Sequence, residues 1–322
     1  MPTTVHEERM ENDYSLLLRG LRGGALANAA GLDYQAFKRT LAPRYGRVLL
    51  DVLTGYAGLA LLVGGMLALE AHAPAAAMAA CLPAACALGF AMSYMQLFLH
   101  EAAHHNLAPG RRLNDWISHL FITWFLGTAV HTYRPVHWDH HRHLGTAEDP
   151  ERSYFQPLGW KQVLGLLAGV RVVQVMRLRF ALGRARGGQP NPYPLFTALV
   201  NGAIMAAAWW AGFPVLVATW ALALASFFPF WCALRQLLEH RDPAMGDARG
   251  ANGPTSRLFG DGLFARAFGG AGFNRHLLHH LEPQVPYTRL AELEAYLMET
   301  ELAPLLARHR TTYGRTVRDL WR

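Results

Sequence analysis

Three long runs without a charged residue constrain this 322-residue chain more than any other feature. They cover residues 52–69, 75–99 and 193–234, and the last run is interrupted only by Gly212, Phe213 and Pro214. A helix needs roughly 20 apolar residues to cross a hydrocarbon core about 30 Å thick. The sequence therefore predicts an all-α integral membrane protein with four transmembrane helices in two hairpins.

The composition agrees with a membrane-embedded chain and excludes other classes. Hydrophobic residues make up 52% and charged residues only 16%, whereas a soluble domain carries about 25% charge and a disordered chain carries more. The cysteines Cys81, Cys86 and Cys232 lie in apolar runs, so we expect no disulfide framework. We expect a single domain over residues 1–322, with an N-terminal segment at 1–48 and a C-terminal tail at 284–322.

The positions of the basic residues predict the orientation of the helices. The short connections at residues 70–74 and 212–214 contain no Lys or Arg, whereas Arg111, Arg112, Arg184 and Arg186 all belong to the central region. The positive-inside rule then places both termini and the central region in the cytoplasm. The net charge of +7 is thereby gathered on one face, where it would attract membrane lipids with anionic headgroups or an acidic protein. No nucleic-acid-binding module is recognisable.

Shorter apolar segments predict further helices outside the spans. Residues 117–130 and 162–170 are too short to cross a membrane and indicate interfacial or re-entrant helices. The tail predicts a helix over residues 287–303 that ends at Pro304. Together with the central region, these segments would form a cytoplasmic helical cap.

Histidine is the unusual residue of this chain, with sixteen copies. The candidate metal ligands belong to three groups, at residues 100–105, 137–141 and 276–280. A further candidate is His240, which follows the fourth predicted span. Since positions i, i+3 and i+4 share one helix face, we expect each group to aim its imidazoles at one point. The predicted ligands are His100, His104, His105, His137, His140, His141, His240, His276, His279 and His280.

So many imidazoles exceed what one tetrahedral zinc can use, and they suit two metal ions with open positions. Ligation that is rich in histidine and poor in carboxylate favours iron, although other first-row metals remain possible. Gln236 lies one helical turn before His240 and could bind the metal through water or donate a hydrogen bond. Asp139, Asp149, Glu239 and Glu282 flank the groups, and we expect some of them either to accept from the outer nitrogens of ligand histidines or to pair with arginines.

Other metal-site interpretations account for less of the pattern. His100, Glu101 and His104 match HExxH, which would make the chain an intramembrane zinc protease with Glu101 as general base. That interpretation leaves the other two groups unexplained. A ferritin-like site would need further Glu ligands, and a metal transporter would place ionisable groups within the spans.

The order HxxxH, HxxHH and HxxHH around four spans resembles the membrane fatty acid desaturase family, which includes hydroxylases and carotenoid ketolases. The resemblance covers residues 51–286. It implies a di-iron centre, with two irons per chain, that activates O₂ with two electrons from a donor such as a ferredoxin or a cytochrome b5-like protein. The histidine boxes would lie on the cytoplasmic side of a membrane, which we expect to be a bacterial inner membrane.

The expected reaction is insertion of a double bond into a fatty-acyl chain carried by a lipid, CoA or acyl carrier protein. The resemblance also allows a hydroxylase or ketolase that acts on an acyl, sterol or carotenoid substrate.

Overall fold

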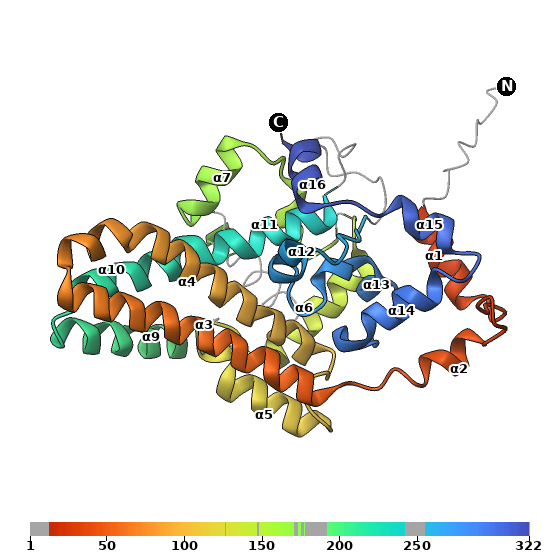
Figure 1. The fold of residues 1–322 in the computed structure, drawn as a ribbon, viewed down its shortest axis with the longest axis horizontal. Coiled ribbons are helices and arrows are strands. Elements are labelled where there is room, and N and C mark those ends of the chain that lie inside the picture. The colour runs from red at the N-terminus through yellow and green to blue at the C-terminus, as the bar shows by residue number, and fades with distance from the viewer. Residues whose placement is uncertain are drawn as a thin grey trace.

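The computed structural model describes residues 13–125, 127–146, 148–170, 173–174, 177, 192–241 and 255–321. Within these residues the secondary structure is helical, and the only β-type pairs are isolated bridges. Long apolar helices form a bundle at one end of the molecule, and short helices form a cap at the other (Figure 1). Arg184, Arg186 and residues 1–12 of the N-terminal segment lie outside the described residues.

The first two predicted spans form the longest helices. Helix α3 runs over Tyr45–His72 and α4 over Pro74–Ala103, with only Ala73 between them. Pro74 is tolerated because the first turn of a helix needs no backbone donor at that position. The two helices pack against each other in the bundle (Figure 1).

The third apolar run forms a second pair of helices at the predicted break. Helix α9 covers Tyr193–Trp210, and α10 (Pro214–Leu222) continues through a π-helical turn at Ala223–Phe227 into α11 (Phe228–His240). Among the residues that the structure describes, three helical segments are long and apolar enough to cross a membrane: Tyr45–His72, Pro74–Ala103 and Pro214–His240. Helix α9 is uncharged but is not among them. The fourth span therefore stays a prediction.

A buried carboxylate joins the two helix pairs at the end of the bundle far from the cap. Glu70, near the end of α3, accepts hydrogen bonds from the backbone N–H groups of Val215 (2.7 Å) and Leu216 (2.8 Å). These are free donors of the first turn of α10, where the positive end of the helix dipole stabilises a carboxylate. Glu70 thus fixes the position of α10 relative to α3.

Close packing of α4 against the π-helical turn depends on Gly89. A Cβ atom built there would lie 2.5 Å from Phe227 Cβ and 2.7 Å from the backbone of Phe227 and Phe228. Since the obstructing atoms include backbone, the neighbouring helix would have to shift as a whole.

We therefore expect Gly89→Ala to destabilise the protein by about 1–3 kcal/mol, the usual cost of overpacking. The measurement is the thermal midpoint of the purified chain in detergent. Gly58→Ala in α3 is the matched control, since nothing lies within 4 Å of its added Cβ. Equal midpoints for the two variants would contradict the tight contact.

Helix α5 has its polarity reversed relative to a helix of a soluble protein. It covers Arg111–Phe121, buries Asn114 and Ser118, and exposes Leu113, Trp116 and Leu120. Asn114 donates to the carbonyl of Ala102 and accepts from Leu107 N–H, so it holds the C-terminal end of α4 in place. The predicted helix over residues 117–130 is wrong in its bounds, since α5 ends at Phe121 and a 3₁₀ turn follows at Thr123–Phe125.

The cap is built from short helices that surround the ends of α4 and α11. It includes α6 (Val130–His143), α7 (Trp160–Leu167), α12 (Leu263–Phe268), α13 (His276–Leu281) and α14 (Leu290–Leu297). The chain's two ends add α1 (Asp13–Arg22), α2 (Tyr34–Lys38), α15 (Ala303–Arg308) and α16 (Tyr313–Leu320). Leucines of the tail fill the core of this cap, among them Leu290, Leu293, Leu297 and Leu306.

The C-terminal tail differs from expectation at Pro304. Pro304 lies in the first turn of α15, which begins at Ala303, because proline suits the first turn of a helix. The predicted helix over residues 287–303 is therefore wrong in its bounds.

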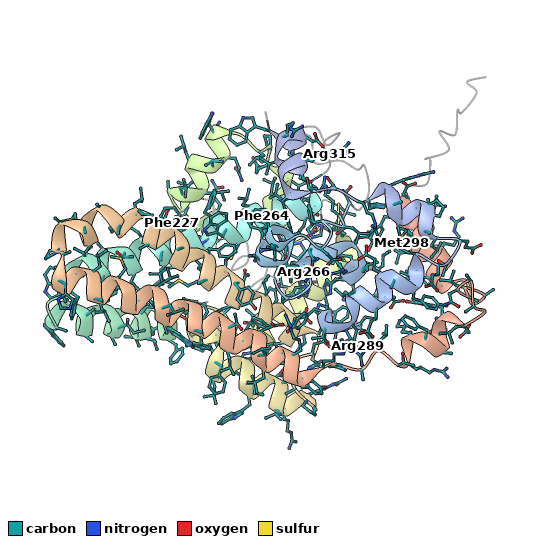
Figure 2. The ribbon with its side chains drawn as sticks, in the orientation of Figure 1. Phe227, Phe264, Arg266, Arg289, Met298 and Arg315 are labelled. Atoms are coloured by element: carbon teal, nitrogen blue, oxygen red, sulfur yellow. The ribbon has the colours of Figure 1, made fainter. Side chains whose placement is uncertain are left out.

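Phe264 on α12, labelled in Figure 2, is 67% exposed, and its neighbour Leu263 is 88% exposed.

Candidate metal centre

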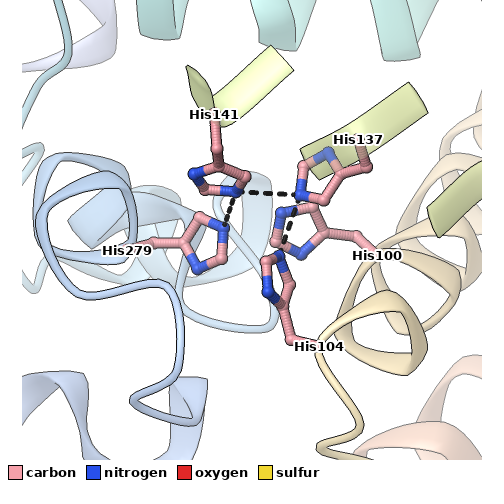
Figure 3. A group of neighbouring side chains, drawn as sticks. All are labelled: His100, His104, His137, His141 and His279. Atoms are coloured by element: carbon pink, nitrogen blue, oxygen red, sulfur yellow. Dashed lines mark hydrogen bonds between the residues drawn. The ribbon is translucent and has the colours of Figure 1, made fainter. Parts of the chain in front are cut away.

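Five histidines from three helices meet beside the cap end of α4. His100 lies in the last turn of α4 and His104 directly after it, His137 and His141 lie on α6, and His279 lies on α13. The ligand atoms of these five side chains all lie within 4.8 Å of one another. Figure 3 shows the rings turned toward a common centre.

The distances between the facing nitrogens are short and uniform. His137 Nε2 lies 2.9 Å from His104 Nε2 and 3.0 Å from His141 Nε2, which in turn lies 3.1 Å from His279 Nε2 (Figure 3). Each Nε2 atom carries either one proton or one lone pair. Hydrogen bonds alone therefore cannot satisfy a nitrogen that faces two others, whereas one shared cation can.

A second group of four histidines adjoins the first. His140, His240 and His280 have ligand atoms within 4.8 Å of one another. His276 Nε2 lies 2.9 Å from His240 Nε2 and 3.1 Å from His280 Nε2. The ring centroids of His141 and His280 are 4.4 Å apart, so the two groups form one continuous centre.

The helical repeat explains why each HxxHH sequence contributes to both groups. With about 100° per residue, position i+4 is rotated about 40° from position i, and position i+3 about 60° to the opposite side. His137 and His141 accordingly face the first group, and His140 faces the second. On α13 the pair His276 and His280 faces the second group and His279 the first. The expectation that each box aims at a single point is wrong for these two boxes.

The electrostatic environment keeps these rings in the form that binds metal. Burial lowers the pKa of five imidazole rings well below the ordinary value, and the neighbouring imidazoles lower it further. These rings belong to His137, His141, His276, His279 and His280. Burial also lowers the pKa of His104 to about 3. Neutral imidazole carries the free lone pair that a metal needs.

The arrangement of the nine histidines fits a pair of metal ions. Nitrogen ligands at about 2.1 Å from one ion and at right angles lie about 3.0 Å apart, which is close to the observed 2.9–3.1 Å between Nε2 atoms. The outward nitrogens of His100, His140 and His240 are held by protein acceptors. The two histidine groups could each hold one metal ion.

Comparison with known proteins agrees with this centre. The family model for fatty acid desaturases matches residues 75–314, which include all ten predicted ligands. The chain belongs to the fatty acid desaturase family. It is 27% identical over 225 residues to a beta-carotene ketolase of Paracoccus sp. (strain PC1), covering 64% of this chain and 76% of that protein. A beta-carotene ketolase of Paracoccus sp. (strain N81106 / MBIC 01143) is 26% identical over 207 residues, covering 63% and 75%.

Membership of the desaturase family, together with the ketolase relatives, identifies the chain as an oxidoreductase. It also weighs against the zinc protease interpretation. Glu101 does not face an open position, since its carboxylate lies 3.1 Å from His100 Nδ1 and accepts from Asn106 Nδ2 at 3.0 Å. A general base of a protease would instead have to reach a metal-bound water.

Three histidines have their outer nitrogen held by a protein acceptor. His140 Nδ1 lies 2.9 Å from the buried carboxylate of Asp149, and His240 Nδ1 lies 3.0 Å from the carbonyl of Thr255. His100 Nδ1 contacts Glu101 as described. Such contacts fix the tautomer and the ring orientation, so that Nε2 is the atom presented to a metal.

Other predicted site residues lie elsewhere. His105 is not in either group, because the backbone leaves α4 there with φ of 63° and the ring lies 3.4 Å from Arg134 and 3.9 Å from Asp115. Gln236 donates to Glu151 Oε2 at 2.7 Å. Asp139 pairs with Arg142, and Glu282 accepts from Tyr34 and Lys38.

Sequence reasoning missed several residues around the centre. Tyr133 stacks on His137 with ring centroids 5.2 Å apart, and Tyr154 donates to Asp149. Glu151 approaches His137 Nδ1 at 3.8 Å. Tyr133 could have been found from its position one turn before His137, but nothing in the spacing distinguished Tyr154 or Glu151.

Proposed function

We propose that this chain is an O₂-dependent di-iron oxidase of membrane-dissolved, apolar long-chain substrates. The observation that carries the proposal is the convergence of nine buried or half-buried histidines into two adjoining groups. One iron would be held by His100, His104, His137, His141 and His279, and the other by His140, His240, His276 and His280. His105 is not part of this proposed ligand set.

When bound, the iron pair supplies the oxidising power that an unactivated C–H bond requires and that no side chain possesses. The residues of the chain provide the surroundings of the metals. Asp149, Glu101 and the Thr255 carbonyl orient ligand imidazoles. Burial of the rings excludes water, which keeps them neutral and protects reactive species from side reactions.

The position of the centre supports a substrate that arrives from the bilayer. The histidines lie at the cap end of α4 and α11, opposite the connections at Ala73 and Gly212. The reversed polarity of α5 and the exposed Leu263 and Phe264 of α12 suit a headgroup interface at the same level. We propose four spans, with α9 as the fourth, and a cytoplasmic cap, in keeping with the predicted orientation.

An external electron donor is part of the proposal, because each O₂ consumed requires two electrons that neither substrate nor protein supplies. The exposed arginines of the cap, among them Arg142, Arg308 and Arg315, offer a basic surface. An acidic ferredoxin-like or cytochrome b5-like protein would be attracted to it.

Ketolation of a carotenoid-like substrate is the reaction we favour. Both relatives described above are beta-carotene ketolases. Fatty-acyl desaturation is the second candidate, supported by the family model. The two reactions begin with the same demand on the site, hydrogen removal from a methylene, so the histidine geometry does not separate them.

Product analysis tests the proposal directly. We expect the full chain, expressed in a bacterium that makes β-carotene, to yield products that gain one oxygen and lose two hydrogens by mass spectrometry. Loss of two hydrogens from fatty-acyl chains without change in the carotenoid would establish the second candidate instead. A variant with His137→Ala is the negative control, and products that persist in it would refute the metal centre as their source.

A further inference from the structure

Among the side chains that border the second histidine group, Glu239 is the one whose surroundings are unexplained. It lies beside His240 on α11 and is 2% exposed. Its Oε1 atom has no hydrogen-bond partner among the described residues. Burying a carboxylate with too few partners is unfavourable, so a binding partner for this carboxylate is to be expected.

The neighbouring cation does not provide that partner. Arg235, one turn earlier on α11, interacts electrostatically with Glu239, but its guanidinium donates to the carbonyls of Phe268 and Ser93 and to the hydroxyl of Ser93. No Arg235–Glu239 pair within 4.0 Å occurs in the described part of the chain. Tyr313 is also near, yet its hydroxyl is buried without a hydrogen-bond partner among those residues.

The carboxylate instead reaches the metal-facing side of the histidines. Glu239 Oε2 lies 3.6 Å from His276 Nε2, the atom that also faces His240 and His280. The ligand atoms of Glu239, His240 and His276 all lie within 4.8 Å of one another. Two atoms bound to one ion at about 2.1 Å can be at most about 4.2 Å apart, so Oε2 and His276 Nε2 can share an ion.

Counting ligands and charges leads to the same residue. The first group has five imidazoles, whereas the second has four. Two divalent cations would lie in a medium of low dielectric constant, where a carboxylate that can reach an ion directly is strongly favourable. From these contacts we propose that Glu239 is the fifth protein ligand of the second metal ion, a carboxylate in an otherwise histidine-only centre.

This inference rests on the proposed function, because it requires that the second histidine group binds an ion at all. The test is therefore metal binding and not turnover. Purified full-length chain in detergent is stripped with a chelator, titrated with ferrous iron under anaerobic conditions, and assayed for iron per chain and for its ⁵⁷Fe Mössbauer spectrum. The variants are Glu239→Gln and, as the matched control, Tyr313→Phe, which keeps the ring stacked on Phe259.

We expect the wild type to take up two irons, and Glu239→Gln to bind one of them at least about 10-fold more weakly, with only one component of the Mössbauer spectrum altered. Tyr313→Phe should match the wild type. If Glu239→Gln binds both irons as the wild type does, the inference is overturned and the proposed function stands. If Tyr313→Phe loses the same iron, the role of Glu239 is to pack α16, and the inference is again overturned.

A wild-type chain that binds no more than one metal ion would overturn the inference together with the proposed di-iron centre. Should Glu239→Gln not fold, Glu239→Asp takes its place, because it keeps the charge but is one methylene shorter. Weakened binding of one iron in that variant supports ligation by Glu239. Unchanged affinity for both irons in a folded Glu239→Asp protein would count against it.

Discussion

Replacing His279 with alanine is expected to abolish oxidation and to remove metal from the first histidine group. His279 is the only member of that group contributed by α13, and its Nε2 lies 3.1 Å from His141 Nε2. Without it, α13 contributes no ligand to the first site. Loss of an outer contact typically costs 10–100-fold in metal affinity or activity, so loss of a ligand should lower turnover by more than about 100-fold.

The measurements are product formation in cells and metal content of the purified chain. His105→Asn is the matched control, because this histidine lies outside both groups and asparagine tolerates the positive φ of 63° found there. We expect the control to keep wild-type metal content and at least most of the activity. A His279→Ala protein with full metal content and turnover would refute the proposed first site, and loss of metal from His105→Asn would return His105 to the ligand set.

Asp149→Asn is expected to lower metal affinity and turnover by about 10–100-fold, the usual effect of a lost orienting contact. Asp149 is fully buried, and its two oxygens accept from three donors: His140 Nδ1, the Tyr154 hydroxyl and Glu151 N–H. An asparagine of the same size has one oxygen and one NH₂ group. The NH₂ group must then face either the Glu151 N–H, which Oδ1 accepts, or the Tyr154 hydroxyl, which Oδ2 accepts, and His140 Nδ1 keeps only one of the two oxygens that it contacts.

Metal titration and product analysis of Asp149→Asn would measure this effect, and Tyr154→Phe separates its two causes. Tyr154→Phe removes one donor to Asp149 but leaves the contact with His140 intact. We expect it to lose less than Asp149→Asn. Equal losses would mean that Asp149 acts by anchoring Tyr154, and unchanged iron affinity in both variants would show that the orientation of His140 does not depend on them.

The sequence by itself determined the apolar helices and the candidates for the site. Uncharged runs predicted α3, α4 and the break at Gly212, because an apolar segment of that length has few other stable forms. The histidine spacing identified nine residues that the fold brings together, since i, i+3 and i+4 positions are neighbours in any helix. The family resemblance is confirmed by the match over residues 75–314.

Only the tertiary structure decided how these histidines are shared between two groups. The helical repeat separates His137 and His141 from His140, but the group that each side meets depends on where α6 lies relative to α4 and α11, which local spacing does not encode. The exclusion of His105 follows from a single backbone angle after α4. The approach of the Glu239 carboxylate to His276 depends on how α11 and α13 lie relative to each other, because a buried carboxylate takes partners from whatever the fold places around it.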